Sequence, residues 1–249
     1  MATRKVIKRP PLAEVEILER VDKTDDLTLV WIEKPEGYTF KPGQYCTIGH
    51  DGVERAYSIA SAPHEERIEL FIELVPVEEG GVLTPLLWGL GEGDKVTIRP
   101  RAKGIFTLKD EKKHQLLVST VTGVVPYVSF LRDYIKEGKS GHHFYVLEGA
   151  SYFDEFVYDT EFIAVSQEHP ELVTFVPTVS RPDEPKNSDW KGDKGRVNNI
   201  VLDKIQELGL PIEETMVYAC GHPGMIEDVK EKVVPLGFDF LEERFWKDD

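Results

Sequence analysis

Three side chains near the middle of the first half of the chain could together hold a phosphorylated aromatic ligand. Arg55 carries a planar guanidinium that can donate two parallel hydrogen bonds to a phosphate group. Tyr57 offers a flat ring for stacking, and Ser58 places a hydroxyl group next to that ring. In an extended segment alternate side chains share a face, so Arg55 and Tyr57 would point to the same side. The same residues also fit an ordinary barrel strand with a surface arginine and a half-buried tyrosine.

A glycine pair further along is a second candidate for binding phosphate. Gly80 and Gly81 are followed by Thr84 and Pro85, which predicts a helix with Thr84 as its N-cap and Pro85 in its first turn. Backbone N–H groups at the start of a helix attract anions. Two glycines before a helix are more often only a turn. The main support for this candidate is therefore the preceding segment with Arg55, Tyr57 and Ser58.

In the second half, three short apolar segments each lead into a turn of small or polar residues. The segments cover about residues 115–119, 173–179 and 216–220. Ligands of open parallel sheets bind beyond the carboxyl ends of the strands. We therefore expect a ligand site at the edge of the sheet where these segments end.

The periodicity of apolar residues divides the chain into two parts. Residues 12–110 show short alternating segments separated by turns, which predicts a closed antiparallel β-barrel. After a charged run at 109–113, strands alternate with helices, the last helix running from Gly224 to about Leu236. This alternation predicts a parallel sheet covered by helices on both faces. We expect two domains, residues 1–111 and 112–249.

Composition excludes several classes of partner. The 249 residues have a formal net charge of −15, which argues against binding to nucleic acid. No apolar run is long enough to span a membrane, and residues 1–9 lack the apolar core of a secretory signal, so we expect a cytoplasmic protein that is not bound to a membrane. Cys46 and Cys220 cannot by themselves bind a metal or an iron–sulfur cluster, and no metal site is expected.

These motifs, taken in order, resemble the ferredoxin-NADP reductase family of the bacterial type. The resemblance covers nearly the whole chain after residue 12 and rests on short segments at family-like spacing: 40–45, 55–63, 80–85, 122–126, 180–181, 220–225 and 245–246. It implies a β-barrel domain that binds FAD, followed by a Rossmann-like α/β domain that binds NADP(H). It also implies a flavoenzyme, often monomeric, that exchanges electrons with ferredoxin or flavodoxin.

The resemblance assigns roles in the barrel half. It implies that Arg55 binds the FAD pyrophosphate, together with Gly81 and Thr84. Tyr57 and Ser58 would contact the isoalloxazine ring, with the Ser58 hydroxyl near N5. At the C-terminus, Phe245 or Trp246 would stack on the opposite face of the flavin and move aside before nicotinamide binds.

In the second half the resemblance implies that Thr122 and Gly123 form the pyridine-nucleotide turn. Val121 departs from the family pattern, which usually has glycine there, and its side chain could limit approach of the backbone to the ligand. Cys220, at the start of a Cys-Gly-x-Pro motif with Gly221 and Met225, would flank nicotinamide C4 during hydride transfer. A free cysteine at a strand end is otherwise usually a small buried hydrophobe.

The choice between NADPH and NADH depends on residues around the adenosine ribose. Ser180, Arg181 and Arg196 favour a 2′-phosphate, because hydroxyl and guanidinium groups bind phosphate. Against this, Asp183 and Glu184 follow closely, and no arginine follows the preceding strand. We expect NADPH to be preferred.

Two alternatives stay open from the sequence. The chain could be an NADH-linked flavin reductase component that serves an oxygenase or a haem protein, or a partner-dependent electron-transfer subunit in which Val121 impairs the nucleotide site. Basic residues that could dock an acidic redox carrier, or simply be solvated, occur in two clusters: Arg4, Lys5, Lys8 and Arg9, and Arg99, Arg101 and Lys103.

Overall fold

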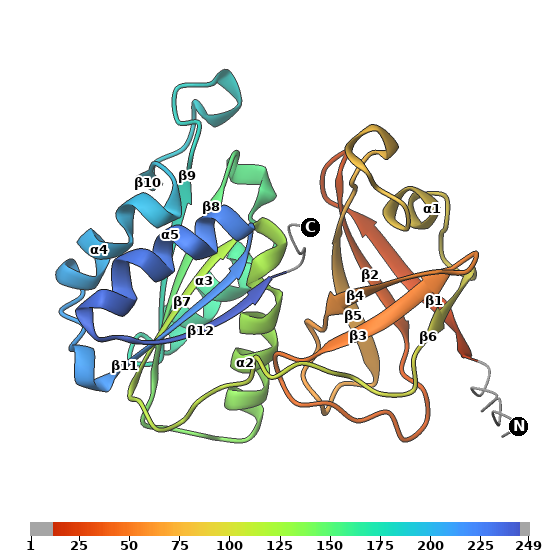
Figure 1. Ribbon diagram of the computed structural model, residues 1–249, viewed down its shortest axis with the longest axis horizontal. Coiled ribbons are helices and arrows are strands. Elements are labelled where there is room, and N and C mark those ends of the chain that lie inside the picture. Colours follow the sequence, from red (N-terminus) through yellow and green to blue (C-terminus); the bar gives the residue numbers. More distant parts are fainter. Residues whose placement is uncertain (1–11, 245–249) are drawn as a thin grey trace, which may run out of the picture.

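The computed structural model describes residues 12–244, which form two six-stranded sheets side by side (Figure 1). The first sheet is antiparallel and curls into a barrel, and the second is parallel with helices on both faces. This arrangement confirms the predicted fold class. The connection between the two sheets runs from residue 99 to residue 113. The aromatic pair Phe245 and Trp246 and the basic cluster at residues 4–9 lie outside the described residues.

The barrel is built from short strands, some of which alternate buried and more exposed side chains, while two are buried along most of their length. In order of pairing it is β4-β3-β6-β1-β2-β5. The two end strands approach each other just after β4, where the backbone N–H of Ala60 donates to the carbonyl of Glu69 at 2.9 Å, so the barrel is nearly closed. Its elements are β1 (Ala13–Asp22), β2 (Leu27–Glu33), β3 (Tyr45–His50), β4 (Val53–Ser58), β5 (Arg67–Glu73), η1 (Val77–Glu79), α1 (Thr84–Trp88) and β6 (Lys95–Ile98).

The start of α1 differs from the prediction. Thr84 is the first helical residue rather than the N-cap, and Leu83 precedes it without a side-chain cap. The Thr84 hydroxyl is instead used by Val75, whose N–H donates to it at 3.0 Å and whose carbonyl accepts from it at 3.2 Å. The predicted N-cap was wrong because this hydroxyl bonds across the loop instead of along the helix.

The second sheet has the strand order β10-β9-β8-β7-β11-β12, and all of its strands are parallel. α2 and α3 pack on one face in a core with Leu117 and Val146, and α4 and α5 pack on the other with Leu116 and Leu147. Its elements are β7 (His114–Thr120), η2 (Val121–Val124), α2 (Val125–Lys136), β8 (His143–Ala150), η3 (Phe153–Glu155), α3 (Asp159–Glu168), β9 (Val173–Val179), η4 (Pro185–Asn187), β10 (Asp193–Lys194), α4 (Val197–Glu207), η5 (Ile212–Glu214), β11 (Thr215–Gly221), α5 (Pro223–Val233), η6 (Val234–Leu236) and β12 (Asp239–Arg244).

The sequence pattern did not reveal the edge strands β10 and β12. The last helix ends three residues before Leu236, at Val233, and η6 leads into Gly237 in a left-handed conformation. The chain then turns back as β12, which pairs in parallel with β11 from Met216 to Gly221. β12 contains four charged residues among six, so no apolar alternation marks it.

Helix α2 joins the two halves. Most of its side chains are buried, because one side packs on the parallel sheet and the other on the barrel. Phe130 of α2 stacks on Phe106 of the connection, with ring centroids 6.1 Å apart. Ser129 donates a hydrogen bond to the Ser61 carbonyl at 2.7 Å. Barrel residues such as Phe71 belong to the same buried cluster, so one core extends across both halves.

Candidate functional site

A cavity of about 650 Å³ opens on the barrel between β4, β5 and the loop before α1. This volume suits a small-molecule ligand. All five residues proposed from the first half of the chain line it: Arg55, Tyr57, Ser58, Gly81 and Thr84. The structure therefore gathers the ring-binding and phosphate-binding candidates around one space, while their roles stay predictions.

The strand β4 sets the depth of its three side chains. Arg55 is exposed, Tyr57 is half-buried, and Ser58 is 7% exposed at the end of the strand. Burial raises the pKa of the Tyr57 phenol, which therefore stays neutral at physiological pH. The cavity thus offers a cation near its rim and a neutral ring and hydroxyl deeper in.

Gly81 and Thr84 hold the loop that forms the other wall of this cavity. A side chain at Gly81 would clash with the carbonyl of Val75, and the Thr84 hydroxyl bonds to both backbone polar groups of Val75. Both residues line the cavity and also fix the loop, so each has a structural reason to be present besides any ligand contact.

Glu243 is a site residue that the sequence analysis missed. Its carboxylate lies 3.5 Å from the Ser58 hydroxyl, and its position on β12 is paired with Cys220 of β11. Burial raises the pKa of Glu243 to about 7, and the bond from Ser58 opposes that rise. The charge of this group therefore changes near neutral pH, beside the deepest hydroxyl of the barrel cavity.

A second cavity, of about 470 Å³, lies beyond the carboxyl ends of the parallel strands. α4 and α5 begin at this cavity, with Arg196 and His222 as their N-cap residues. Their first N–H groups and the positive ends of their dipoles favour an anion there. Six of the residues proposed from the sequence line it: Thr122, Ser180, Arg181, Arg196, Gly221 and Met225.

Two proposed residues lie behind the cavity walls. A side chain on Gly123 would clash with the carbonyl of Cys220, so this glycine allows η2 to pack directly on the end of β11. The Cys220 side chain is fully buried in the core, where burial, and then the nearby Glu243, raise the pKa of its thiol. Neither residue lines either cavity.

Val121 has an unusual backbone conformation at the rim of the second cavity. Its φ is +42°, in the left-handed region that disfavours a β-branched residue. The side chain packs against two buried clusters, one under α2 and one containing Phe156 and Val179. The turn therefore keeps a side chain where backbone geometry favours glycine.

The two cavities meet at Glu73 and Thr122, which line both of them. Glu73 ends β5, and its pKa is raised to about 7, first by burial and then by the neighbouring carboxylates of Asp26, Glu155 and Glu79. A ligand in one cavity and a ligand in the other would come together at this junction.

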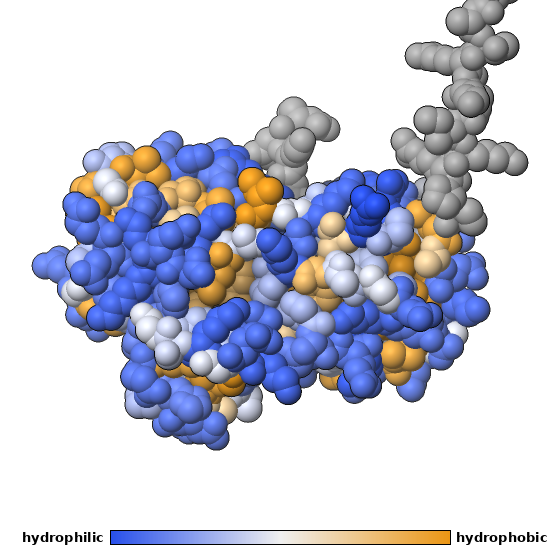
Figure 2. All heavy atoms as spheres, turned by 90° about the horizontal axis from the view of Figure 1, so that it is seen from below, coloured by the Kyte–Doolittle hydropathy of each residue, from blue (hydrophilic) through white to orange (hydrophobic). Residues whose placement is uncertain are grey.

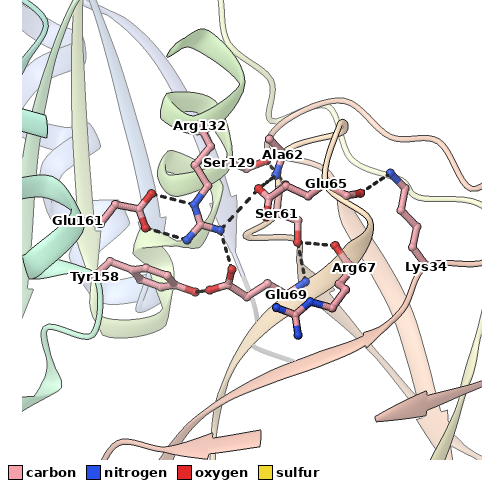
Figure 3. A network of polar contacts seen from close by, with 10 residues as sticks. All are labelled: Lys34, Ser61, Ala62, Glu65, Arg67, Glu69, Ser129, Arg132, Tyr158 and Glu161. Atoms are coloured by element: carbon pink, nitrogen blue, oxygen red, sulfur yellow. Dashed lines mark hydrogen bonds and ion pairs between the residues drawn. The ribbon is translucent and has the colours of Figure 1, made fainter. Parts of the chain in front are cut away.

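An ion-pair network joins the barrel to α2 and α3 (Figure 3). Arg132 of α2 donates to Glu69 of the barrel at 2.6 Å and forms two bonds, of 2.7 and 2.8 Å, with Glu161 of α3. Tyr158 donates to the other oxygen of Glu69 at 2.8 Å, and Glu65 lies 3.7 Å from Arg132. Glu69 is 3% exposed, so its carboxylate depends on Arg132 and Tyr158 in place of water.

Comparison with known proteins bears on the family of the chain. Residues 117–231 match the family model described as oxidoreductase NAD-binding domain. The chain is 32% identical over 210 residues to the ferredoxin--NADP reductase of Pseudomonas aeruginosa, covering 77% of each protein. It is 31% identical over 193 residues to protein RfbI of Salmonella typhimurium. That match covers 77% of this chain but only 54% of the relative.

A solved structure is similar over nearly its whole length. The ferredoxin NADP+ reductase from Neisseria gonorrhoeae, with bound FAD and NADP, superimposes with a TM-score of 0.81 at 24% identity, covering 94% of this chain and 99% of that one. Within residues 12–244, no helix is long and apolar enough to cross a membrane.

Proposed function

The chain belongs to the ferredoxin-NADP reductase family, and on that premise we propose that it is an FAD-dependent oxidoreductase exchanging electrons between NADP(H) and a one-electron carrier such as ferredoxin or flavodoxin. The observation that supports this most directly is the junction of the two cavities at Glu73 and Thr122. A flavin held by the barrel and a nicotinamide held by the parallel sheet would meet there.

The residues around the barrel cavity fit FAD by their donor chemistry. Arg55 suits the pyrophosphate, the half-buried ring of Tyr57 suits an aromatic ring system, and the loop from Gly80 to Thr84 closes around the space. When bound, FAD supplies the capacity to accept hydride and to release electrons one at a time. The protein holds the flavin in place and controls its surroundings.

Ser58 and Glu243 supply a proton-carrying pair at the inner end of this cavity. Because the pKa of Glu243 is about 7, its carboxyl group can hold or release a proton at physiological pH. The 3.5 Å contact connects it to the Ser58 hydroxyl, which lines the cavity. We propose that this pair positions and supplies a proton close to the reacting edge of the flavin.

The second cavity fits an anionic dinucleotide. The start of α5 and Thr122 suit the pyrophosphate, whereas Ser180, Arg181 and Arg196 suit a 2′-phosphate. This set supports NADPH as the preferred donor.

An anaerobic stopped-flow measurement tests the proposed function. The purified protein should show flavin absorbance, and NADPH should bleach it much faster than NADH does. The opposite preference would move the chain to the NADH-linked reductases that serve an oxygenase or a haem protein. Absence of a flavin spectrum would contradict the proposal altogether.

One observation favours a second candidate, a partner-dependent electron-transfer subunit. The positive φ of Val121 and its position at the cavity rim would hinder nucleotide from approaching the turn. Val121→Gly would remove both the strain and the side chain. If this substitution creates NADPH-dependent bleaching that the natural chain lacks, the subunit reading is correct, whereas comparable rates in both proteins identify the valine as a tolerated variant.

A further inference from the structure

Two loops at the rim of the nucleotide cavity are held together by one buried side chain. Asn187 is 2% exposed, and its amide nitrogen donates to the carbonyls of Ser151 and Arg181, each at 2.9 Å. Its amide oxygen accepts from the N–H of Phe153 at 3.0 Å. Ser151 and Arg181 both line the cavity, so Asn187 fixes where their loops lie relative to the ligand space.

Arg181 is already engaged by two partners on these loops. Its guanidinium donates to the Tyr152 hydroxyl at 3.0 Å and lies over the Tyr152 ring, 5.4 Å from the centroid. Glu184 accepts a short hydrogen bond from the same hydroxyl and lies 3.7 Å from Arg181. The carboxylate of Glu184 therefore already uses donors of Arg181 and Tyr152 that are of the kind that binds phosphate oxygens.

Other charges around this group are paired elsewhere or lie apart. Lys186 covers the Tyr152 ring at 4.5 Å but forms its ion pair with Asp154, at 2.9 Å. The exposed carboxylate of Asp183 forms no hydrogen bond or ion pair within the described residues. Asp183 and Glu184 carry the same charge, but only Glu184 contacts Arg181 and Tyr152.

We infer that Glu184 is an internal counter-ion that a 2′-phosphate must displace from Arg181 and Tyr152, so that it sets how strongly the protein distinguishes phosphorylated from unphosphorylated adenosine nucleotides. This inference rests on the proposed nucleotide-dependent function. A 2′-phosphate would take over the Tyr152 hydroxyl hydrogen bond and the guanidinium contact that Glu184 now makes. A nucleotide without the 2′-phosphate leaves the Glu184 contacts in place.

Binding of two simple nucleotides tests the inference without any turnover. Adenosine 2′,5′-bisphosphate and adenosine 5′-monophosphate are titrated by calorimetry into the wild-type protein, Glu184→Gln and Asp183→Asn. Both substitutions remove one negative charge from adjacent exposed positions. Because the pair is exposed, we expect Glu184→Gln to tighten binding of the bisphosphate about two- to five-fold, with little change for the monophosphate. Asp183→Asn should change both affinities only slightly.

The possible outcomes separate this inference from the proposed function. Equal effects of the two substitutions would show that only general charge matters and would overturn the inference. An equal gain for both nucleotides would also overturn it, because no 2′-phosphate is then involved. If neither nucleotide binds to any of the three proteins, the proposed nucleotide site itself is wrong. Binding of both with a selective gain in Glu184→Gln supports both statements.

Discussion

Burial and the Ser58 hydroxyl shift the pKa of Glu243 in opposite directions, and the effect of burial is the larger. Its pKa of about 7 lies above the usual value for a glutamate in an unfolded chain. Between about pH 4.5 and pH 7 the folded protein therefore holds a proton that the unfolded chain releases. The free energy of unfolding falls as pH rises through this range and stays lower above it.

Glu243→Gln should remove this loss of stability. We expect the free energy of unfolding of the variant, relative to wild type, to rise by about 1–3 kcal/mol between pH 5 and pH 8. Urea denaturation at several pH values measures it. Glu231→Gln, which removes an exposed carboxylate, controls for the change in net charge. A constant difference between Glu243→Gln and wild type across this range would contradict the prediction.

Gly123 is a residue for which structure and sequence suggest different roles. Gly123→Ala places a methyl group against the Cys220 carbonyl, and overpacking of this kind costs about 1–3 kcal/mol. We expect a lower thermal midpoint for Gly123→Ala, whereas Gly91→Ala, which has open space around it, should change little. Unchanged stability with weakened nucleotide binding would instead favour a direct ligand role for this glycine.

Site residues could be predicted from the sequence where they lie close together along the chain. Arg55, Tyr57 and Ser58 are adjacent on one strand, and the structure places them on one cavity. Glu243 could not be found in this way, because it is 185 residues from Ser58 and lies in a strand that is mostly charged. The available signal in the sequence was that Glu243 lies between the apolar pair Phe240 and Leu241 and the aromatic pair Phe245 and Trp246.

At the scale of elements, α2 carries the contacts that hold the barrel against the parallel sheet. Burial alone would lower the pKa of Arg132, but the bonds to Glu161 and Glu69 raise it above its usual value. The Arg132 side chain is 22% exposed, and Glu69 is almost fully enclosed. Removing the cation would leave Glu69 buried with the Tyr158 hydroxyl alone as a partner.

Arg132→Gln should therefore be strongly destabilising. Loss of one member of a buried ion pair costs about 3–5 kcal/mol of stability. We expect a loss toward the lower end of that range, because Arg132 is partly exposed. Lys139→Ala breaks the more exposed pair with Asp133 and should cost under about 1 kcal/mol. Urea midpoints of the two variants provide the comparison. Equal midpoints would show that the network contributes no more than a surface pair.

Most elements could be predicted because their apolar spacing is clear. The barrel strands and the alternating strands and helices follow from that spacing and are confirmed. The N-cap of α1 could not be predicted, since the Thr84 hydroxyl bonds across a loop to Val75. The edge strands were missed because β10 has two residues and β12 is rich in charge.

At the scale of the whole molecule, the charge is unevenly distributed. The chain has a net charge of −15, yet residues 95–109 contain five basic and no acidic side chains. Lys103 bonds through its backbone to Tyr45, which is paired with Ser58, and Ile105 is 81% exposed beside it. Hydrophilic residues cover most of the face seen in Figure 2, with only scattered apolar groups. If the chain exchanges electrons with an acidic carrier as proposed, the basic residues at 95–109 offer a docking surface by charge.

Reversing this local charge tests the docking surface. We expect the double variant Arg101→Glu and Lys103→Glu to raise KM for ferredoxin or flavodoxin about ten-fold or more at low salt, and less at high salt because the interaction is screened. Reduction of ferricyanide by NADPH should not change. The matched variant Lys136→Glu and Lys139→Glu, on α2 and the turn that follows it, controls for net charge. A similar rise in KM for both variants would contradict a localised surface.

The shared core has a consequence for synthesis of the protein. Barrel residues Leu27, Ala60 and Phe71, and Phe106 of the connection, lie in one buried cluster with side chains of α2 as far as Tyr134. During translation the barrel sequence emerges first, and its apolar side stays open until α2 has left the ribosome. At about 5–20 residues per second this interval lasts a few seconds. A nascent chain that pauses after the barrel would therefore expose this apolar surface to chaperones for longer. Translation without a pause would shorten the time during which the chain can aggregate.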